Sequence, residues 1–391
     1  MWKYASRNVE EINGNVETTM DIGIDARMMG TGHGGIGRYV LELVKNLLAI
    51  DKQNQYLIFL NDKDRGLLDG LTDNRINLIS CNIRHYSLGE QFGFYRLLNK
   101  YPLDVMHFPN FNLPVKYKKP FVVTIHDLVH HKISGHKKSR FLHFLAYKKV
   151  IDAAAKNSRA ILTVSEASKK DIIGYLQVPP EKVTVTYEGS SLATEITQRQ
   201  VEEVKRRYLL DKPYFLFVGV LERKKNVVNL TRGFDKFLQK YRINMDLVIV
   251  GKADPHYPEI KHSALDIKHP EHLVFTGRVD DEELSALYKG AYAFTSASLH
   301  EGFGLPGVEA LAFGLPLLVS NTPVFNEIYD NAAIYFNPLD PDDIAEKMNL
   351  AVRDEQFYRQ LQGKSFYRSQ FFDWRITAGK TLEVYKEVMK S

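Results

Sequence analysis

The pattern that most constrains the fold of this 391-residue chain is a repeated alternation of short apolar segments with segments of helical periodicity. Such alternation predicts parallel strands whose sheet is covered by helices on both faces. A first series predicts strands at residues 21–27, 56–60, 77–81, 105–108, 121–125, 160–164 and 183–186. A second series predicts strands at residues 214–219, 246–250, 272–275, 291–296, 317–319 and 333–336. Because a single core rarely serves so long a chain, we expect two doubly wound, Rossmann-like α/β domains.

The domain limits follow from where these series begin and end. Residues 1–19 are polar and aperiodic, and we expect them to be a disordered extension. The N-terminal domain is predicted over residues 20–195 and the C-terminal domain over residues 196–370, with a charged join near residues 197–211. The last part of the chain, from residue 344 onward, has few strand signals and is predicted to be helical.

Composition excludes several classes of protein. With 44% hydrophobic and 25% charged residues, the chain has the balance of a soluble globular protein. Its single cysteine, Cys81, excludes a disulfide framework and favours a reducing compartment, so we expect a cytoplasmic location. No apolar run reaches the ~20 residues of a membrane-spanning helix. The net charge of +5 is small and the basic residues are dispersed, so no nucleic-acid partner is expected.

A glycine-rich turn between the predicted strand 291–296 and a short helix carries two carboxylates, Glu301 and Glu309. Pro306 suits the first helical turn, and Gly314 suits the residue after the helix. The free N–H groups and the positive dipole at a helix N-terminus bind phosphate well. Carboxylates instead accept hydrogen bonds from hydroxyls, so the turn predicts a polyhydroxylated ligand that carries phosphate. An ordinary turn with two solvated glutamates is the alternative.

Three consecutive cations, Arg223, Lys224 and Lys225, follow the predicted strand 214–219 and its terminal glycine. A cluster of this kind beside a glycine can bind a diphosphate. A solvated run of charge is the alternative.

A second glycine-rich segment follows the first strand and matches G-x-G-x-x-G at Gly32, Gly34 and Gly37. That match raises a nicotinamide-dependent oxidoreductase as an alternative function. In the dinucleotide-binding turn, however, the glycines follow the strand almost at once, whereas residues 27–31 intervene here. We prefer a loop whose bare backbone at Gly34 and Gly35 lets a ligand approach closely.

Two histidines follow neighbouring predicted strands. His126 stands at the carboxyl end of strand 121–125, where ligands of open α/β sheets bind, and His107 ends the preceding strand. A hydrogen-bonded loop histidine is the alternative for His126. Farther along, residues 130–151 contain six Lys or Arg and four His without an acidic residue, interleaved with aromatic side chains. This stretch is either a peripheral contact with an anionic membrane or a solvated helix face.

Four segments in this order resemble the family 4 glycosyltransferases, which are retaining enzymes of the GT-B type. They are the glycine loop that runs into Gly-Ile-Gly-Arg-Tyr, the pair His126-Asp127, the segment from Gly219 to Asn226, and the double-glutamate turn. Residues 371–374, Phe-Phe-Asp-Trp, resemble the start of the family's closing helix. The resemblance implies two Rossmann-like domains that face each other across a cleft, with a C-terminal helix over 371–391 that packs back toward the N-domain.

The resemblance also implies roles for individual residues. His126 would contact the donor sugar near its reacting carbon, and Glu301 would hold that sugar; these two form the catalytic set. The other implied donor-binding residues are Gly34, Gly35, Arg223, Lys224, Lys225, Val279, Phe303, Gly304, Leu305 and Glu309. Many family members have an arginine next to the matched lysine; here Lys224 stands there and the arginine is displaced to Arg223. Which of the two contacts phosphate therefore stays open.

The implied reaction moves a hexose, with mannose from GDP-mannose as the expected donor, to a glycan or lipid-linked acceptor with retention of configuration. The expected partners are therefore a GDP- or UDP-linked nucleotide sugar and that acceptor, as in polysaccharide biosynthesis. No cofactor or metal is expected. Two Asp-x-Asp patterns, Asp62/Asp64 and Asp340/Asp342, lie in turn-like contexts rather than in a metal site. A non-catalytic nucleotide-sugar-binding protein remains a further alternative.

Overall fold

The computed structural model describes residues 19–71, 73–128, 138–254, 257 and 259–390. The extension predicted over residues 1–19 lies outside these ranges except for Thr19. Of the basic stretch 130–151, residues 130–137 also lie outside them.

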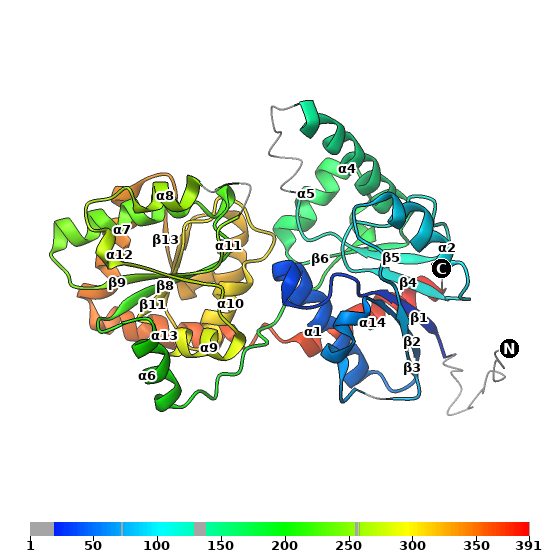
Figure 1. The fold of residues 1–391 in the computed structure, drawn as a ribbon, viewed down its shortest axis with the longest axis horizontal. Helices are drawn as coiled ribbons and strands as arrows, with labels where there is room; N and C mark the ends of the chain where they lie inside the picture. The colour runs from blue at the N-terminus through cyan, green and yellow to red at the C-terminus, as the bar shows by residue number, and fades with distance from the viewer. Residues whose placement is uncertain (1–18, 72, 129–137, 255–256, 258, 391) are drawn as a thin grey trace. The chain divides into compact units, whose positions relative to one another are not determined.

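The chain divides into two compact units, whose elements are labelled in Figure 1. Unit 1 comprises Met1–Val164, Lys169–Thr186 and Trp374–Ser391, and unit 2 comprises Ser165–Ser168 and Tyr187–Asp373. Apart from the short segment Ser165–Ser168, the chain passes between units after Thr186 and after Asp373, whereas the sequence predicts these passages after residues 195 and 370.

The described residues of unit 1 form a seven-stranded parallel sheet in the order β3-β2-β1-β4-β5-β6-β7. Its strands are β1 (Asp21–Asp25), β2 (Gln55–Leu60), β3 (Ile76–Ser80), β4 (Val105–Phe108), β5 (Phe121–Thr124), β6 (Ala160–Thr163) and β7 (Val183–Val185). Strands β4 and β5 are buried along their whole length. Burial on both faces explains why these strands read as continuous apolar runs.

The helices of unit 1 lie on the two faces of this sheet (Figure 1). They are α1 (Gly34–Ile50), α2 (Tyr95–Leu98), α4 (Lys138–Asn157), α5 (Glu166–Leu176) and α14 (Trp374–Lys390), with short turns η1 (Thr31–His33), η2 (Asp62–Leu68), η3 (Glu90–Phe94) and η4 (Pro180–Lys182). Helix α1 buries Val40, Leu43, Val44 and Leu47, as helical periodicity predicts.

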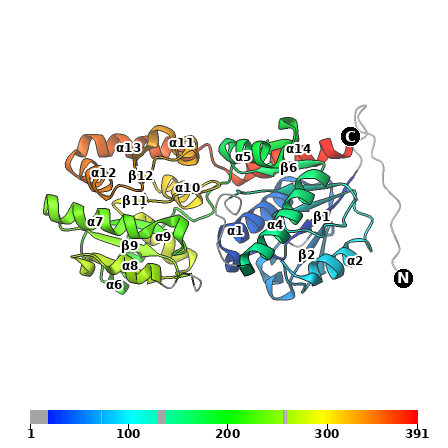
Figure 2. The same ribbon diagram turned by 90° about the horizontal axis from the view of Figure 1, so that it is seen from above.

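The C-terminal helix α14 belongs to unit 1, although residues 187–373 of unit 2 precede it in the chain. It packs against α1 and contacts β4 and β6. In Figure 2 the red α14 lies among the blue and green elements of unit 1. The predicted return of the last helix to the N-terminal domain is confirmed.

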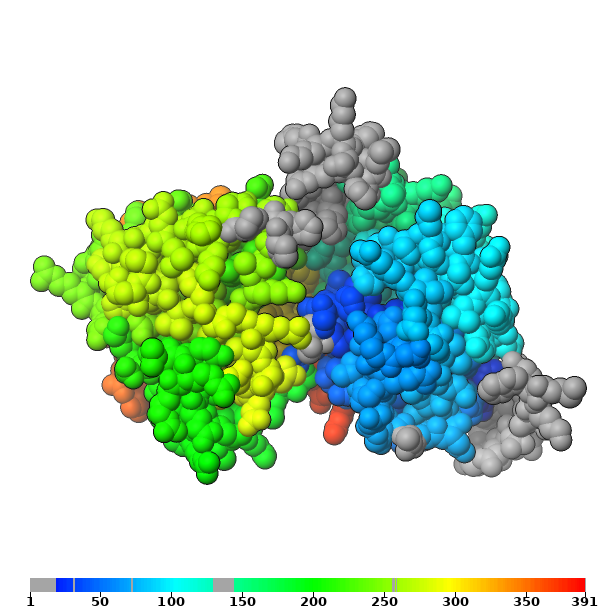
Figure 3. Space-filling model, viewed as in Figure 1, coloured from blue at the N-terminus to red at the C-terminus, as the bar shows by residue number. Residues whose placement is uncertain are grey.

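The described residues of unit 2 form a six-stranded parallel sheet in the order β10-β9-β8-β11-β12-β13. Its strands are β8 (Tyr214–Val218), β9 (Asp246–Val250), β10 (Leu273–Gly277), β11 (Ala293–Ser296), β12 (Leu317–Ser320) and β13 (Ala333–Phe336). Its helices are α6 (Gln198–Arg207), α7 (Val227–Tyr241), α8 (Glu259–Leu265), α9 (Asp281–Gly290), α10 (Leu305–Ala312), α11 (Pro323–Tyr329), α12 (Pro341–Arg353) and α13 (Glu355–Ser369), with turns η5 (Arg223–Lys225), η6 (Pro270–His272) and η7 (Asp330–Ala332). Figure 3 shows one face of the surface of the units, coloured along the chain as in Figure 1.

Both units have the same strand order, in which the first strand lies inside the sheet and later strands add on either side of it. The order reverses between β1 and β4 in unit 1, and between β8 and β11 in unit 2. Ligands of doubly wound folds bind beyond the carboxyl ends of the strands at such a switch point. The predicted pair of Rossmann-like sheets is confirmed, and each unit has one switch point at which a ligand can bind.

Candidate functional site

The switch point of unit 2 brings together a lysine and a glutamate that are far apart in the sequence. Lys225 ends η5, which follows β8, and Glu301 lies in the loop after β11. Lys225 Nζ lies 2.5 Å from Glu301 Oε1, and only 14% and 12% of the two side chains are exposed. Gly219 lies against the lysine stem: a Cβ there would be in ordinary contact with Lys225 Cε, at 3.5 Å, and in tight contact with the Phe217 ring, at 3.3 Å.

The electrostatics of this pair keep the glutamate charged. Burial raises the pKa of Glu301, but the charges of Lys225 and Lys224 and hydrogen bonds from Lys225 and Ser298 lower it by more, so its pKa lies below the ordinary value. Lys225 has three N–H donors and uses one on Glu301, so the same ammonium can also donate to a phosphate. A hydroxyl-accepting carboxylate and a phosphate-binding cation thus lie side by side.

The structure separates the two cations whose roles the sequence leaves open. Arg223 is 70% exposed, pairs with Glu259 at 3.3 Å and lies over the ring of Tyr257. Lys224 is 24% exposed, pairs with Glu222 at 3.5 Å and helps to lower the pKa of Glu301. Its carbonyl also accepts a hydrogen bond from Leu299 N, which ties the η5 segment to the loop of Glu301. The structure therefore brings Lys224, and not Arg223, beside Glu301.

The glycine-rich turn folds as the sequence predicts, with Gly304 before the first residue of α10 and Pro306 in the first turn. Gly304 has a φ of 98°, which a side chain would strain. The Tyr329 hydroxyl donates to the Gly304 carbonyl at 2.7 Å, and a Cβ at Gly304 or Gly307 would collide with that hydroxyl. Tyr329 is thus a supporting residue of the turn that the sequence did not reveal, because it comes from α11.

The second carboxylate of the turn, Glu309, is 3% exposed on α10. The Tyr288 hydroxyl lies 3.0 Å from Glu309 Oε2 and 3.0 Å from the Pro306 carbonyl oxygen, and these two acceptors share its single hydrogen. Glu309 is therefore held in place by α9, and the donor-binding role that the resemblance implies for it stays a prediction. Val279 is half-buried between β10 and α9, while Phe303 and Leu305 are buried beside Gly304.

In unit 1, the glycine loop opens α1. Gly34 has a φ of 61°, both Gly34 and Gly35 are exposed, and a Cβ at either would meet no atom within 4 Å. Gly37 differs, because a Cβ there would collide with the Gly30 carbonyl. Residues 26–30 separate the end of β1 from η1, so the loop lacks the immediate strand-to-glycine turn of a nicotinamide site.

His126 follows β5, and its Nε2 lies 3.0 Å from the Pro109 carbonyl. A carbonyl only accepts, so Nε2 carries the hydrogen of this bond. The ring also meets the edge of Tyr39 at 4.6 Å between centroids. His126 and the glycine loop are thus on unit 1, while Lys225, Glu301 and Glu309 are on unit 2.

Behind His126 lies a buried hydrogen-bond network. His107 Nε2 lies 2.9 Å from Thr124 Oγ1, which lies 3.1 Å from the Tyr39 hydroxyl. His107 Nδ1 lies 2.6 Å from the hydroxyl of Tyr385 on α14. Burial, with a smaller effect from His126, lowers the pKa of His107 to about 3. His107 is therefore neutral, and the network joins α14 to the ring that packs on His126.

The aspartates of the two Asp-x-Asp patterns accept hydrogen bonds from neighbouring protein groups. Asp340 caps α12 by accepting from the N–H groups of Asp342 and Asp343, and Asp62 accepts from Ser80 and Asn82. Among the described residues, no group of three or more His, Cys, Asp and Glu is placed to hold a metal ion. Within the same residues, no helix is long and apolar enough to cross a membrane.

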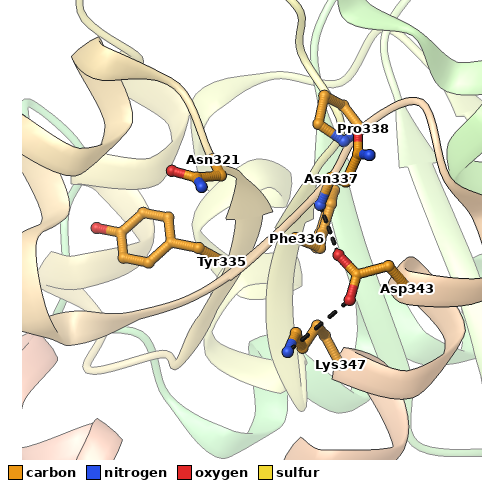
Figure 4. Close-up of a pocket in the computed structure, with 7 residues that line it drawn as sticks. All are labelled: Asn321, Tyr335, Phe336, Asn337, Pro338, Asp343 and Lys347. Atoms are coloured by element: carbon orange, nitrogen blue, oxygen red, sulfur yellow. Dashed lines mark hydrogen bonds and ion pairs between the residues drawn. The ribbon is translucent and has the colours of Figure 1, made fainter.

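A pocket of about 380 Å³ lies beside β13, and none of its lining residues is a predicted site residue (Figure 4). Asp343 there accepts from Asn337 N at 2.6 Å and pairs with Lys347 at 3.8 Å. Asp343 thus binds two other groups that line the pocket, and Lys225 and Glu301 are not among the lining residues.

Comparison with known proteins agrees with this arrangement. The family model "Glycosyl transferases group 1" matches residues 199–365, and the model "Glycosyltransferase Family 4" matches residues 33–193. O-antigen chain mannosyltransferase B of Escherichia coli is 26% identical over 377 residues, which is 90% of this chain and 96% of that protein. The serotype-specific mannosyltransferase WbdA of Escherichia coli is 28% identical over 237 residues, 59% of this chain but only 29% of that longer protein.

Solved structures show the same fold at low sequence identity. Sucrose-phosphate synthase of Thermosynechococcus elongatus superposes with a TM-score of 0.76 at 18% identity, covering 95% of this chain and 99% of that one. HepE of Anabaena, solved in complex with UDP-glucose, has a TM-score of 0.74 at 15% identity over 94% of this chain and 100% of that one. Since the two family models between them match most of both units, the chain belongs to the family 4 glycosyltransferases and is a glycosyltransferase of the GT-B fold.

Proposed function

We propose that this glycosyltransferase moves mannose from GDP-mannose to a glycan or lipid-linked acceptor hydroxyl, with retention of configuration and without a metal. The observation that carries the proposal is the pair of Lys225 and Glu301 at the switch point of unit 2, next to the N-terminus of α10. The two mannosyltransferases similar to this chain support the choice of sugar. HepE, solved with UDP-glucose, supports a nucleotide-sugar donor and makes UDP-sugars the alternative.

The charges at this site suit departure of a nucleoside diphosphate. Cleavage of a sugar–phosphate bond develops negative charge on the leaving phosphate, which preorganised cations stabilise. Lys225 and Lys224 supply two positive charges, and the dipole of α10 adds partial positive charge at its N-terminus. Glu301 stays ionised beside them and accepts hydrogen bonds from sugar hydroxyls. No bound metal has to supply the charge in this scheme.

The two carboxylates are not assigned as nucleophile and acid. A retaining glycosidase needs two carboxyl groups about 5 Å apart across the bond that breaks. Glu301 is paired with Lys225, and Glu309 is buried against Tyr288. We propose instead that the departing phosphate assists deprotonation of the acceptor hydroxyl on the same face of the sugar, with His126 near the reacting carbon.

A donor screen tests this function. Hydrolysis and transfer are measured with GDP- and UDP-linked mannose and glucose for the wild type, Lys225→Ala and His126→Ala. We expect turnover of GDP-mannose and a loss of about 10²-fold or more in kcat/KM for each variant, the range for removing one preorganised charge-stabilising group. Lys236→Ala is the matched control, because Lys236 forms an exposed ion pair with Asp342 on α7 and α12. Wild-type rates in Lys225→Ala would contradict the assigned role, and NADH binding without nucleotide-sugar turnover would restore the oxidoreductase.

We also propose peripheral contact with an anionic membrane on its cytoplasmic face through residues 130–151. In the described part of this stretch, Leu145 is 46% exposed and Lys148 and Lys149 are exposed on α4. Co-sedimentation with vesicles that contain anionic lipid should exceed that with neutral vesicles and should fall at high salt. Equal sedimentation with both vesicle types would contradict this contact.

A further inference from the structure

Tyr86 presents an exposed aromatic ring from a strained backbone position. It follows β3 with a φ of 53°, in the left-handed region that a bulky residue rarely adopts. The residue is 56% exposed, although its hydroxyl accepts a hydrogen bond from the buried Asn110 of the same unit. Strained backbone that is held in place by its surroundings is a feature of binding sites.

A buried polar network holds Tyr86 both at its backbone and at its hydroxyl group. The Tyr86 backbone N–H donates to Glu90 Oε2 at 3.1 Å, and the hydroxyl accepts from Asn110 Nδ2 at 2.8 Å. Asn110 also donates to Asn112 Oδ1 at 2.7 Å, and Asn112 donates to Glu90 Oε1 at 2.9 Å. Asn110, Asn112 and Glu90 are at most 5% exposed. The ring therefore has one fixed orientation.

The network rests on a buried arginine between two carboxylates. Arg27 is 1% exposed and pairs with Asp25 at 2.6 Å and with Glu90 at 2.7 Å. It also lies 3.9 Å from the centre of the Phe94 ring. Buried ion pairs contribute little net stability, because desolvation offsets their attraction. What this one provides is a rigid support for the residues that hold Tyr86.

The ring lies at the switch point of unit 1, next to the predicted reactive residues of that unit. Asn110, which binds the Tyr86 hydroxyl, directly follows Pro109, whose carbonyl binds His126. On the other side, the His85 ring lies 5.2 Å from Tyr86 and 4.9 Å from His33, the residue before Gly34. The corresponding switch point of unit 2 carries Lys225 and Glu301.

We propose that the face of Tyr86 is the stacking platform for a pyranose ring of the acceptor, an inference that rests on the proposed glycosyl transfer. The C–H groups on one face of a pyranose carry partial positive charge and pack on the negative face of an aromatic ring. The half-buried imidazole of His85 borders the ring, and sugar hydroxyls need such a polar neighbour. Leu88 and Phe92 are exposed on the same segment, so a lipid chain is the competing occupant. Stacking of a sugar on Tyr86 is favoured by a fixed orientation of the ring, whereas contact with a flexible lipid chain does not depend on that orientation.

Binding and turnover together test the platform. The probes are lipid-free α-mannooligosaccharides, with saturation-transfer NMR from protein aromatic protons to sugar C–H protons, alongside transfer and hydrolysis of GDP-mannose. In Tyr86→Ala we expect the saturation transfer to weaken, the acceptor KM to rise about five- to tenfold, and the ratio of transfer to hydrolysis to fall. Tyr86→Phe should retain the saturation transfer, because it keeps the ring. Tyr175→Ala, at a tyrosine 53% exposed on α5, is the matched control and should leave all three readouts unchanged.

The outcomes separate the platform from the proposed function. An unchanged acceptor KM in folded Tyr86→Ala, or wild-type protein that binds none of these sugars, would overturn the platform. A rise in KM that appears only with lipid-linked acceptors, and equally in Leu88→Ala, would assign the surface to lipid. Absence of donor hydrolysis and transfer in the wild type would instead refute the proposed function, and the NMR readout would still report on the sugar.

Discussion

A lysine and a carboxylate that share a nearly buried site stabilise each other only while both are charged. Lys225 and Glu301 meet at 2.5 Å with about one eighth of each side chain exposed. The lowered pKa of Glu301 means that the folded state holds this carboxylate ionised more firmly than the unfolded state does. Its contribution to stability is therefore complete above the unfolded pKa of about 4.3 and is lost as the pH falls through the lower folded pKa.

Lys225→Met should destabilise unit 2 by about 3 kcal/mol at pH 7, because it leaves a buried carboxylate without its cation. The burial that Lys225 offsets would then raise the pKa of Glu301. The difference from the wild type should be smaller at pH 4 than at pH 7, because Glu301 of the variant, whose pKa is raised, takes up a proton before Glu301 of the wild type does. Urea unfolding at pH 7 and at about pH 4 measures this difference in the free energy of unfolding. The double variant Lys225→Met/Glu301→Gln should recover much of the loss at pH 7, and equal stability of the single variant and the wild type would contradict the pairing.

At the scale of elements, α10 owes its approach to α11 to two glycines. The sequence indicates Gly304 and Gly307 as parts of a turn and a helix, since those signals are local. It gives no sign of Tyr329, whose hydroxyl lies against both glycines from 25 and 22 residues away. The same limit applies to Tyr385, which reaches His107 across 278 residues. Strand and helix positions were predictable from local pattern, whereas these partners depend on which helices pack together.

Gly307→Ala should therefore lower stability, although alanine is favoured over glycine by about 1 kcal/mol inside a helix. The added methyl group collides with the Tyr329 hydroxyl and ring, so we expect a net loss of about 1–3 kcal/mol. Gly379→Ala in α14 is the matched control, because a Cβ there meets no atom within 4 Å, and it should be neutral or stabilising. Thermal unfolding compares the two variants. Stabilisation by Gly307→Ala would show that Tyr329 does not occupy this position.

At the scale of the whole molecule, two sheets of one topology carry different chemistry at their switch points. Unit 2 places cations and a carboxylate there, and unit 1 places His126, the glycine loop and the polar network under Tyr86. The fold class was predictable because the inner strands of both sheets are buried and therefore mostly apolar. The hydrogen-bond network that holds Tyr86 was not predictable from the sequence. Its members Arg27, Glu90 and Asn110 are far apart in the chain, and none of them belongs to a recognisable local motif. We also expect mild acid to lower the stability of unit 1 more than that of unit 2.

Unit 1 should lose stability before unit 2 as the pH falls from 6.5 to 4.5. His107 has a folded pKa of about 3, below its unfolded value of about 6.5, so in this window the unfolded chain binds a proton that the folded unit excludes. At 1.36 kcal/mol per pH unit, this difference in proton binding lowers the free energy of unfolding of unit 1 by about 2–3 kcal/mol across the two pH units. The Lys225–Glu301 pair of unit 2 remains charged over the same range.

The emission of Trp374, which is 3% exposed on α14, reports on unit 1, and binding of a nucleotide at the donor site proposed around Lys225 would report on unit 2. Urea unfolding followed by Trp374 emission should shift to lower urea between pH 6.5 and 4.5, while the urea dependence of nucleotide binding shifts less. His107→Gln retains a polar side chain without a group that titrates in this window, so it should flatten the pH dependence of unit 1. The same dependence in His107→Gln as in the wild type would mean that another group causes it, and equal shifts of both reports would mean that the units unfold together.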